Sequence, residues 1–241
     1  MLPVLFQLAE RIMLWPSAWK MLNETVDEIL TTYPEQVLTL HDRDKAQLSQ
    51  LVRLSIDHDN VAIVKGALGV VRALARACFE AVHCNLDDGV QQLQHMLAPS
   101  LGSLLRRLFV TATPPSLLPF LAETFACFAR STIPPPLRLV KQRQEQRRRH
   151  MPEMPLPEPT ANVCLNTLLS QACSHFVSEL HESMRGPVSQ QLQLLVQKIC
   201  ATDVDSRSIG RRQLLRVCCF GRAAGVVQET VALVRAIVVA K

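Results

Sequence analysis

Aromatic residues and glycine are scarce in this chain of 241 residues. It contains one tyrosine, two tryptophans and 8 glycines, and its apolar residues are mainly leucine, valine and alanine. Strands favour β-branched and aromatic residues, whereas leucine and alanine favour helices. No segment alternates apolar and polar residues for long enough to indicate a strand. We therefore expect an all-α fold.

Excess charge is also scarce outside one short segment. The net charge is +5, and residues 141–149 carry five basic side chains against one glutamate, so this segment supplies +4 of the total. The rest of the chain is close to neutral, whereas proteins that bind nucleic acids carry extended basic surfaces. A broad nucleic-acid-binding face is therefore not expected, and any positive field is local.

The motifs of common enzymes and metal sites are absent. The sequence has no G-x-S-x-G, G-x-x-x-x-G-K-[ST], H-E-x-x-H or G-x-G-x-x-G motif, and its eight cysteines form no C-x-x-C pair. Cys78, Cys127 and Cys173 occupy apolar positions of helical patterns, which predicts buried, reduced thiols. We also assign the Cys218-Cys219 pair to core packing. We expect no enzymatic activity, no cofactor and no bound metal.

One short polar cluster has the composition of a catalytic site. The segment SIDHDN, residues 55–60, brings Asp57, His58 and Asp59 together as a general-base site would. The cluster lies where one predicted helix ends and the next begins, and Asp59 or Asn60 is suited to cap the second helix. We therefore interpret it as a capping segment.

Long apolar runs are missing too. No stretch reaches 18 uncharged apolar residues, the length that a membrane-spanning helix requires. Glu10 and Arg11 interrupt the apolar opening MLPVLFQLAERIMLW, and no basic segment precedes it as a signal peptide requires. We expect neither a transmembrane helix nor a membrane partner.

Helical periodicity is clear along most of the chain. In residues 61–78 apolar side chains recur at spacings of three and four, which is the pattern of a helix with a buried stripe. Prolines and aspartates mark further helix starts, and Gly186-Pro187 is expected to break the chain. Gly221 and Gly225 are expected to mark a helix end or a close crossing. Predicted helices begin near Pro16, Asp42, Asn60, Asp87, Pro99, Pro115, Pro136 and Thr160, and a last pair covers residues 206–220 and 226–240.

These helix starts recur in pairs roughly every forty residues, the spacing of HEAT-type helical hairpins. Each such hairpin buries its apolar face against its neighbours. We therefore predict an α-solenoid of HEAT-like antiparallel helical hairpins, and a compact all-α bundle is the alternative. The predicted organisation is helical hairpins in residues 1–137, an inserted basic helix end and proline-rich linker in 138–159, and further hairpins in 160–241.

The basic segment before this linker is the candidate site for a partner. Its residues spread over most of a helix circumference, which suits a solvated helix end. Arginine also binds phosphate groups through two parallel hydrogen bonds, so a charged protein tail or an RNA backbone is a second interpretation. A nuclear address is the third. The candidate partner-binding residues are Lys141, Arg143, Arg147, Arg148 and Arg149.

Several segments, taken in order, resemble the C-terminal part of one receptor group. They read YPEQVLTL, LVRLSIDHDNVAIVKGALGVVRAL, LQHMLAPSLGSLLRRLFVTATPPSLLPFLAETFACFAR and FVSELHESMRGPVSQQLQLLVQKICATDVDSRSIGRRQLLRVCCFGRAAG. The group is the transportin-SR and importin-thirteen type of nuclear transport receptor, within the importin-β superfamily. The resemblance covers most of residues 34–225. It implies stacked helical hairpins that carry protein cargo between cytoplasm and nucleus.

The chain also departs from this group. Residues 138–159 are longer and more basic than the group's usual connection, and residues 226–241 extend beyond its expected end. The repeats with which these receptors grip the GTPase Ran have no counterpart here, and their arginine-rich cargo helix lies upstream of the matched part. The resemblance implies a C-terminal portion, a partial gene product or a short relative, with Ran as a partner only of a full-length receptor. The alternative function is a stand-alone helical scaffold whose basic segment is a nuclear address or a phosphate clamp.

Overall fold

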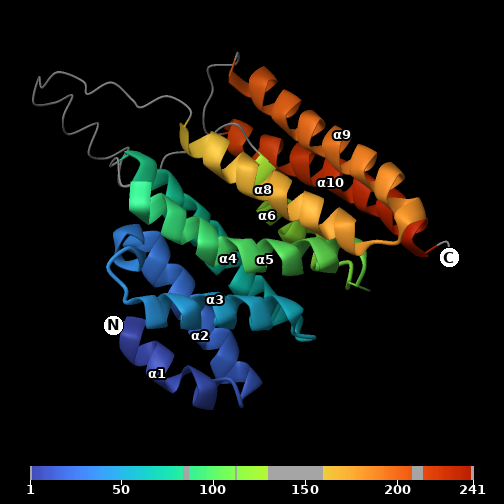
Figure 1. Ribbon diagram of the computed structural model, residues 1–241. Helices are drawn as coiled ribbons and strands as arrows, with labels where there is room; N and C mark the ends of the chain where they lie inside the picture. The colour runs from blue at the N-terminus through green and yellow to red at the C-terminus, as the bar shows by residue number, and fades with distance from the viewer. Residues whose placement is uncertain (1, 84–86, 112, 130–159, 208–213, 240–241) are drawn as a thin grey trace, which may run out of the picture.

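The structure is a computed structural model that describes residues 2–83, 87–111, 113–129, 160–207 and 214–239. Within these ranges it contains nine α-helices and one short 3₁₀-helix, and no strand (Figure 1). The prediction of an all-α fold is confirmed. Among the described helices, none combines the length and the apolarity needed to cross a bilayer.

The helices predicted near Pro16 and Asp42 begin at these residues, and one further helix, which was not predicted, precedes them. Helix α1 covers Leu2–Ile12, α2 covers Pro16–Thr32 with proline in its first turn, and α3 covers Asp42–Asp57. A 3₁₀-helix, Pro34–Val37, separates α2 from α3. Helix α4, Val61–His83, is capped by Asn60, whose Oδ1 accepts a hydrogen bond from the amide of Ala62 at 2.9 Å. The predicted cap is confirmed, because this bond satisfies an amide that has no partner within the helix.

Helix α5 corrects one predicted boundary. It runs from Asp87 to Phe109 with Pro99 inside it, so the prediction of a new helix at Pro99 is wrong. An internal proline removes one helical hydrogen bond and costs about 3 kcal/mol. Tertiary contacts offset this cost, because side chains of α3 bond to α5 on both sides of the proline. Lys45 donates to Gln92 at 2.7 Å, Ser49 donates to the carbonyl of Met96 at 3.0 Å, and Asp57 accepts from Ser103 at 3.1 Å.

The C-terminal half contains α6, Leu118–Ala129, α8, Thr160–Glu179, α9, Glu182–Arg207, and α10, Leu214–Val239. Two further predictions are wrong here. Pro187 lies inside α9 and does not break the chain, because α9 packs against the core on both sides of it, through Met184 before the proline and Val188 after it. The predicted pair of terminal helices is a single helix after residue 214. Gly225 lies inside that helix, and a Cβ added there would meet no atom within 4 Å, so it marks no close crossing.

The helices pack in two rows that share one core (Figure 1). In the first row α1, α3, α5, α8 and α9 contact one another in turn, and in the second row α2, α4, α6 and α10 do so. The pairs α3–α4, α5–α6 and α9–α10 join the rows. One hydrophobic cluster extends from Leu2 to Val234. Helices on the two sides of residues 138–159 therefore pack against each other.

Two close approaches set the spacing between α2 and α4. A Cβ added at Gly66 would lie 2.8 Å from the Cβ of Asn23, and one added at Gly69 would lie 2.8 Å from the carboxyl carbon of Asp27. The buried amide of Asn23 donates to the carbonyl of Ile63 at 3.1 Å and accepts from the hydroxyl of Ser55 at 3.3 Å. Glycine at these two positions of α4 lets the backbones approach closely enough for this polar contact.

Candidate binding surface

The predicted site residues Lys141, Arg143, Arg147, Arg148 and Arg149 lie outside the described residues, as do the side chains of Cys218 and Cys219. The partner-binding prediction for the basic segment therefore stays a prediction. The described helices place other charged side chains on the surface, and these form the candidate site.

Helix α4 carries a narrow basic strip, which we call the α4 row: Lys65, Arg72 and Arg76. Most of the helix is buried, since α2, α3, α5 and α6 all pack against it. Lys65 and Arg72 are half-buried and Arg76 is exposed. Because the three positions are spaced by seven and four residues, they share one face of the helix. The α4 row thus lies between α2 on one side and α6 on the other.

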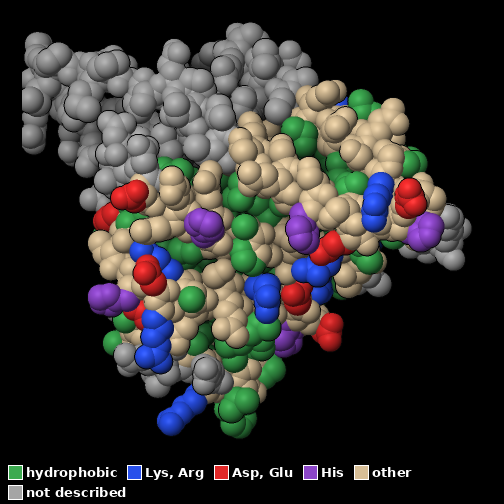
Figure 2. Space-filling model, viewed as in Figure 1, with side chains coloured by type: hydrophobic (Ala, Val, Ile, Leu, Met, Phe, Trp, Pro, Cys, Tyr) green, Lys and Arg blue, Asp and Glu red, His purple; other side chains and the backbone are tan. Residues whose placement is uncertain are grey.

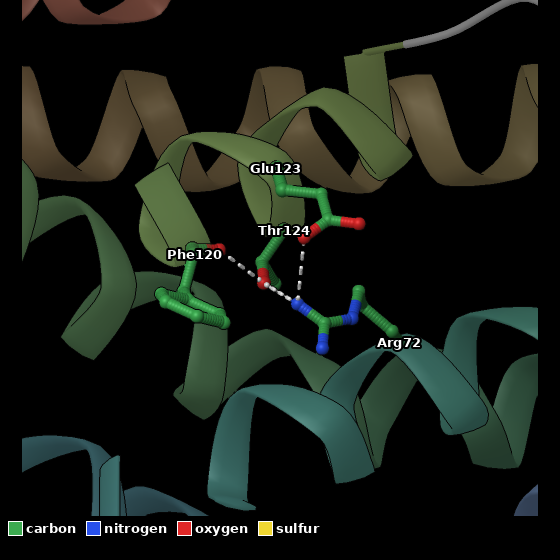
Figure 3. A network of polar contacts seen from close by, with 4 residues as sticks. All are labelled: Arg72, Phe120, Glu123 and Thr124. Carbon is green, nitrogen blue, oxygen red and sulfur yellow. Dashed lines mark hydrogen bonds and ion pairs between the residues drawn. The ribbon is translucent and has the colours of Figure 1, made fainter. Parts of the chain in front are cut away.

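Arg72 joins the α4 row to α6 through two polar contacts (Figure 3). Its Nη1 lies 3.5 Å from Oε2 of Glu123 and donates to the hydroxyl of Thr124 at 3.3 Å. The Thr124 hydroxyl in turn donates to the backbone carbonyl of Phe120 at 2.8 Å. These contacts hold the guanidinium in one orientation, with part of its surface open to solvent.

Lys65 contacts the same helix through an aromatic ring. Its ammonium lies 4.3 Å from the centre of the Phe120 ring, within the range of a cation–π interaction. Such a contact leaves the remaining donors of the ammonium free to bind an acceptor from solvent. Two of the three cations of the α4 row are thereby positioned by neighbouring residues of α6.

Asp27 of α2 borders the α4 row on its other side. Burial raises the pKa of the Asp27 carboxyl above its ordinary value, and this effect exceeds the lowering caused by the hydrogen bond from Thr31 and by the charges of Arg72 and Arg76. The hydroxyl of Thr31 lies 3.2 Å from the Asp27 carboxylate. Ionisation of Asp27 therefore costs free energy in the folded protein.

The substitution Asp27→Asn tests this cost through its pH dependence. A carboxyl whose pKa is raised in the folded state stabilises the fold most below its unfolded pKa, and this stability is lost as the pH rises through the folded pKa. The variant should therefore gain stability relative to the original chain between pH 3 and pH 7. Urea unfolding of both proteins across this range measures the difference, and a relative loss at pH 7 would contradict the assignment.

The segment SIDHDN serves local structure. The ring of His58 packs edge-on against Trp19, with centroids 4.7 Å apart, and its Nδ1 accepts from the amide of Asn60 at 2.8 Å. Asp57 accepts from Ser103 of α5. The side chains of Asp57 and His58 thus contact different partners and do not converge on a common point. The interpretation as a capping segment is confirmed.

The cysteines and the metal-binding residue types form no cluster among the described residues. No group of three His, Cys, Asp or Glu side chains there could hold a metal ion. Cys78 is buried, and Cys127 and Cys173 are half-buried. Burial raises the pKa of the Cys173 thiol to about 12, so this thiol stays protonated at neutral pH and is a poor nucleophile.

The surface of the first row differs from the α4 row. Figure 2 shows Lys and Arg side chains interspersed with Asp and Glu over α3 and α5, without one extended patch of a single sign. Mixed charge of this kind suits contacts with proteins better than binding along a phosphate backbone. The sequence contains a signal for the α4 row, namely three basic residues on one face of an otherwise apolar helix, which the periodicity of the apolar residues alone does not reveal.

Comparisons with known proteins add no family to these observations: no family model, no curated protein and no solved structure matches this chain. The resemblance to nuclear transport receptors therefore stays a prediction. The surfaces of the described helices are the basis on which a function is proposed.

Proposed function

We propose that this protein is an α-solenoid that binds other proteins, with the α4 row and its neighbours on α2 and α6 as a contact surface. The observation that carries the proposal is the register of the helices within each row. In the first row, the bonds that join α3 to α5 link residues 47, 47 and 46 positions apart. Both residue numbers increase together, so the two helices run parallel at a nearly constant offset.

The second row repeats this offset in its first step. Asn23 and Asp27 of α2 lie beside Gly66 and Gly69 of α4, at offsets of 43 and 42 residues. The step from α4 to α6 is longer, since Arg72 meets Glu123 and Thr124 at offsets of 51 and 52. Repeats of about 40–47 residues are typical of HEAT and armadillo arrays, in which equivalent helices stack in parallel. The offsets support a solenoid over a compact bundle.

In the first row, the contact between α5 and α8 agrees with an insertion in the chain between these two helices. The ring of Phe109 in α5 lies 5.9 Å from that of Phe176 in α8, 67 residues further along the chain. Residues 138–159 account for 22 of these positions, and without them the offset would be 45. This supports the predicted division of the chain into two sets of hairpins joined by an inserted segment.

Stacked hairpins of this kind function through extended surfaces that bind proteins. The α4 row supplies three cations, and Asp27 and Glu123 flank it with acidic groups. A surface of both signs favours a complementary protein over a nucleic acid, because charge complementarity selects among protein partners. We extend the proposal to nuclear transport on the strength of the resemblance and the repeat length, with protein cargo, Ran for a full-length receptor, and residence in both nucleus and cytoplasm.

The double substitution Lys65→Gln and Arg76→Gln tests the contact surface. Neither side chain has a hydrogen bond that holds the fold in the described part of the chain, so folding should be retained while the affinity for partners purified with the full-length chain falls roughly tenfold. Binding measured at two salt concentrations should also become less salt-dependent. Unchanged affinity and salt dependence would exclude the α4 row as the contact surface.

A second variant is compared with this double substitution. In it, Gln replaces Lys141, Arg143, Arg147, Arg148 and Arg149. The sequence concentrates +4 charges in residues 141–149, which also supports the second function, a scaffold with its own nuclear address. Fusion of residues 134–159 to a fluorescent reporter separates the two. Nuclear accumulation of the reporter alone favours the address, whereas loss of partner binding in the five-fold variant, without reporter accumulation, assigns the segment to the contact with a partner.

A further inference from the structure

A groove between α5 and α8 lies on the first row, away from the α4 row. Its volume is about 330 Å³, which is within the range of ligand-binding sites. Leu168 and Phe176 of α8 are buried at its base, while Ala98 and Pro99 of α5 form an exposed wall. At one end it is lined by Arg106, His175 and Glu179. We call it the α5–α8 groove.

The middle of the α5–α8 groove is open because residue 102 is glycine. A Cβ built at Gly102 would meet only Nη2 of Arg106, at 4.0 Å. At Gly66 and Gly69, by contrast, a Cβ would collide with α2. Glycine in a helix interior costs about 0.5–1 kcal/mol relative to alanine. At Gly102 no close packing between helices requires glycine, and its effect is to leave room above the apolar base.

The charges at the end of the groove are unequal. His175 Nδ1 lies 3.4 Å from the carboxylate of Glu179, which allows an ion pair when the histidine is protonated. Within the described part of the chain, no hydrogen bond or ion pair engages the exposed guanidinium of Arg106. The groove therefore combines an apolar base with one available positive charge, and Arg106 is one helical turn, about 6 Å, from Gly102.

We propose that the α5–α8 groove binds a short peptide segment of a protein partner through one apolar side chain and one acidic side chain. The apolar side chain lies above Gly102 against Leu168 and Phe176, and the acidic one pairs with Arg106. Guanidinium groups bind carboxylates through two parallel hydrogen bonds, which fixes the orientation of the segment. One turn separates the two subsites, so in a helical peptide the two residues are three or four positions apart. This inference rests on the proposed protein-binding function and specifies a second contact.

Selection of a random dodecapeptide phage library against the full-length chain tests the proposal. We expect the selected peptides to carry Leu, Phe or Met three or four residues from Asp or Glu. In fluorescence anisotropy with the synthetic peptides, Gly102→Leu should raise Kd at least tenfold, because the new side chain fills the groove. Arg106→Gln should raise Kd roughly fivefold, and Glu179→Gln should lower it, since a like charge is removed.

Two controls separate filling of the groove from general effects. Gly225→Leu introduces the same side chain on α10, where a Cβ meets no atom within 4 Å, and Arg53→Gln removes an exposed charge from α3. Both should leave Kd unchanged, and the melting temperature of Gly102→Leu should not fall below that of the original chain.

Selected peptides that bind Gly102→Leu with the original affinity would overturn the proposal for the groove and leave the protein-binding function intact. A library that yields no binding peptide, or peptides rich in Lys and Arg, would overturn the groove as well, while the Lys65 and Arg76 variant tests the protein-binding function separately.

Discussion

Replacement of Arg235 by leucine should lower the free energy of unfolding by about 3 kcal/mol, because each hydrogen bond from a charged donor contributes roughly 1.5–3 kcal/mol. Arg235 lies on α10, and its guanidinium caps the C-terminal end of α5. Its Nε donates to the carbonyl of Leu108 at 2.8 Å, and its Nη2 donates to the carbonyls of Arg107 and Thr111 at 3.2 and 3.0 Å. The carbonyls of Arg107 and Leu108 lie in the last turn of α5, where a helix leaves its last acceptors without helical partners, and Thr111 follows this end. The Thr113 hydroxyl also donates to the carbonyls of Arg107 and Thr111.

The cap also joins parts of the chain that are far apart in sequence, since its partners are 124–128 residues away. Partial burial lowers the pKa of Arg235, which reflects the cost of removing the guanidinium from water. Leucine would leave three carbonyls without this donor. Urea unfolding followed by circular dichroism measures the loss. Arg235→Lys should restore about half of the stability, and Arg53→Leu on the surface of α3 should change it by less than about 0.5 kcal/mol.

Replacement of Gly66 by alanine should lower the free energy of unfolding by about 2 kcal/mol, since overpacking a close contact costs roughly 1–3 kcal/mol. The added Cβ would lie 2.8 Å from the Cβ of Asn23, which belongs to the rigid base of a helical side chain and cannot rotate away. The helices α2 and α4 would have to move apart. This would lengthen the contact between the Asn23 amide and the carbonyl of Ile63.

Gly225→Ala is the matched control for this prediction. The same methyl group on α10 would meet no atom within 4 Å, so the higher helix propensity of alanine should stabilise the chain by about 0.5–1 kcal/mol. The two substitutions should thus have opposite signs in the same unfolding experiment. Equal effects of either sign would contradict the close approach of α2 and α4.

Local sequence patterns predicted most helices of this protein but not where every helix ends. The apolar stripe predicted in residues 61–78 is buried in α4, as Val64, Leu68, Val71 and Cys78 show. Rules for helix ends failed at Pro99 and Pro187, because they describe a helix alone and omit contacts from its neighbours. At Pro99 the helix continues because Lys45, Ser49 and Asp57 of α3 bond to α5 on either side.

The candidate site, too, could be predicted only in part from the sequence. The spacing of Lys65, Arg72 and Arg76 places them on one helix face, and this could be predicted from the sequence. Their orientation could not, because it depends on Phe120 and Glu123, which lie 51 to 55 residues away along the chain. The cap formed by Arg235 and the open groove at Gly102 likewise arise only when distant helices pack. The partner-binding role of residues 141–149 was predicted from charge alone and stays a prediction.

Site-specific photo-crosslinking in living cells tests the central claim most directly. A benzophenone side chain at position 76 lies on the exposed α4 row, and one at position 53 lies on the opposite row as a control. The account predicts covalent adducts of discrete mass from position 76, containing a protein whose yield falls when Lys65 is replaced by Gln, and no such protein from position 53. The same set of adducts from both positions, or no adduct from position 76, would contradict the claim that this helical surface binds a protein partner.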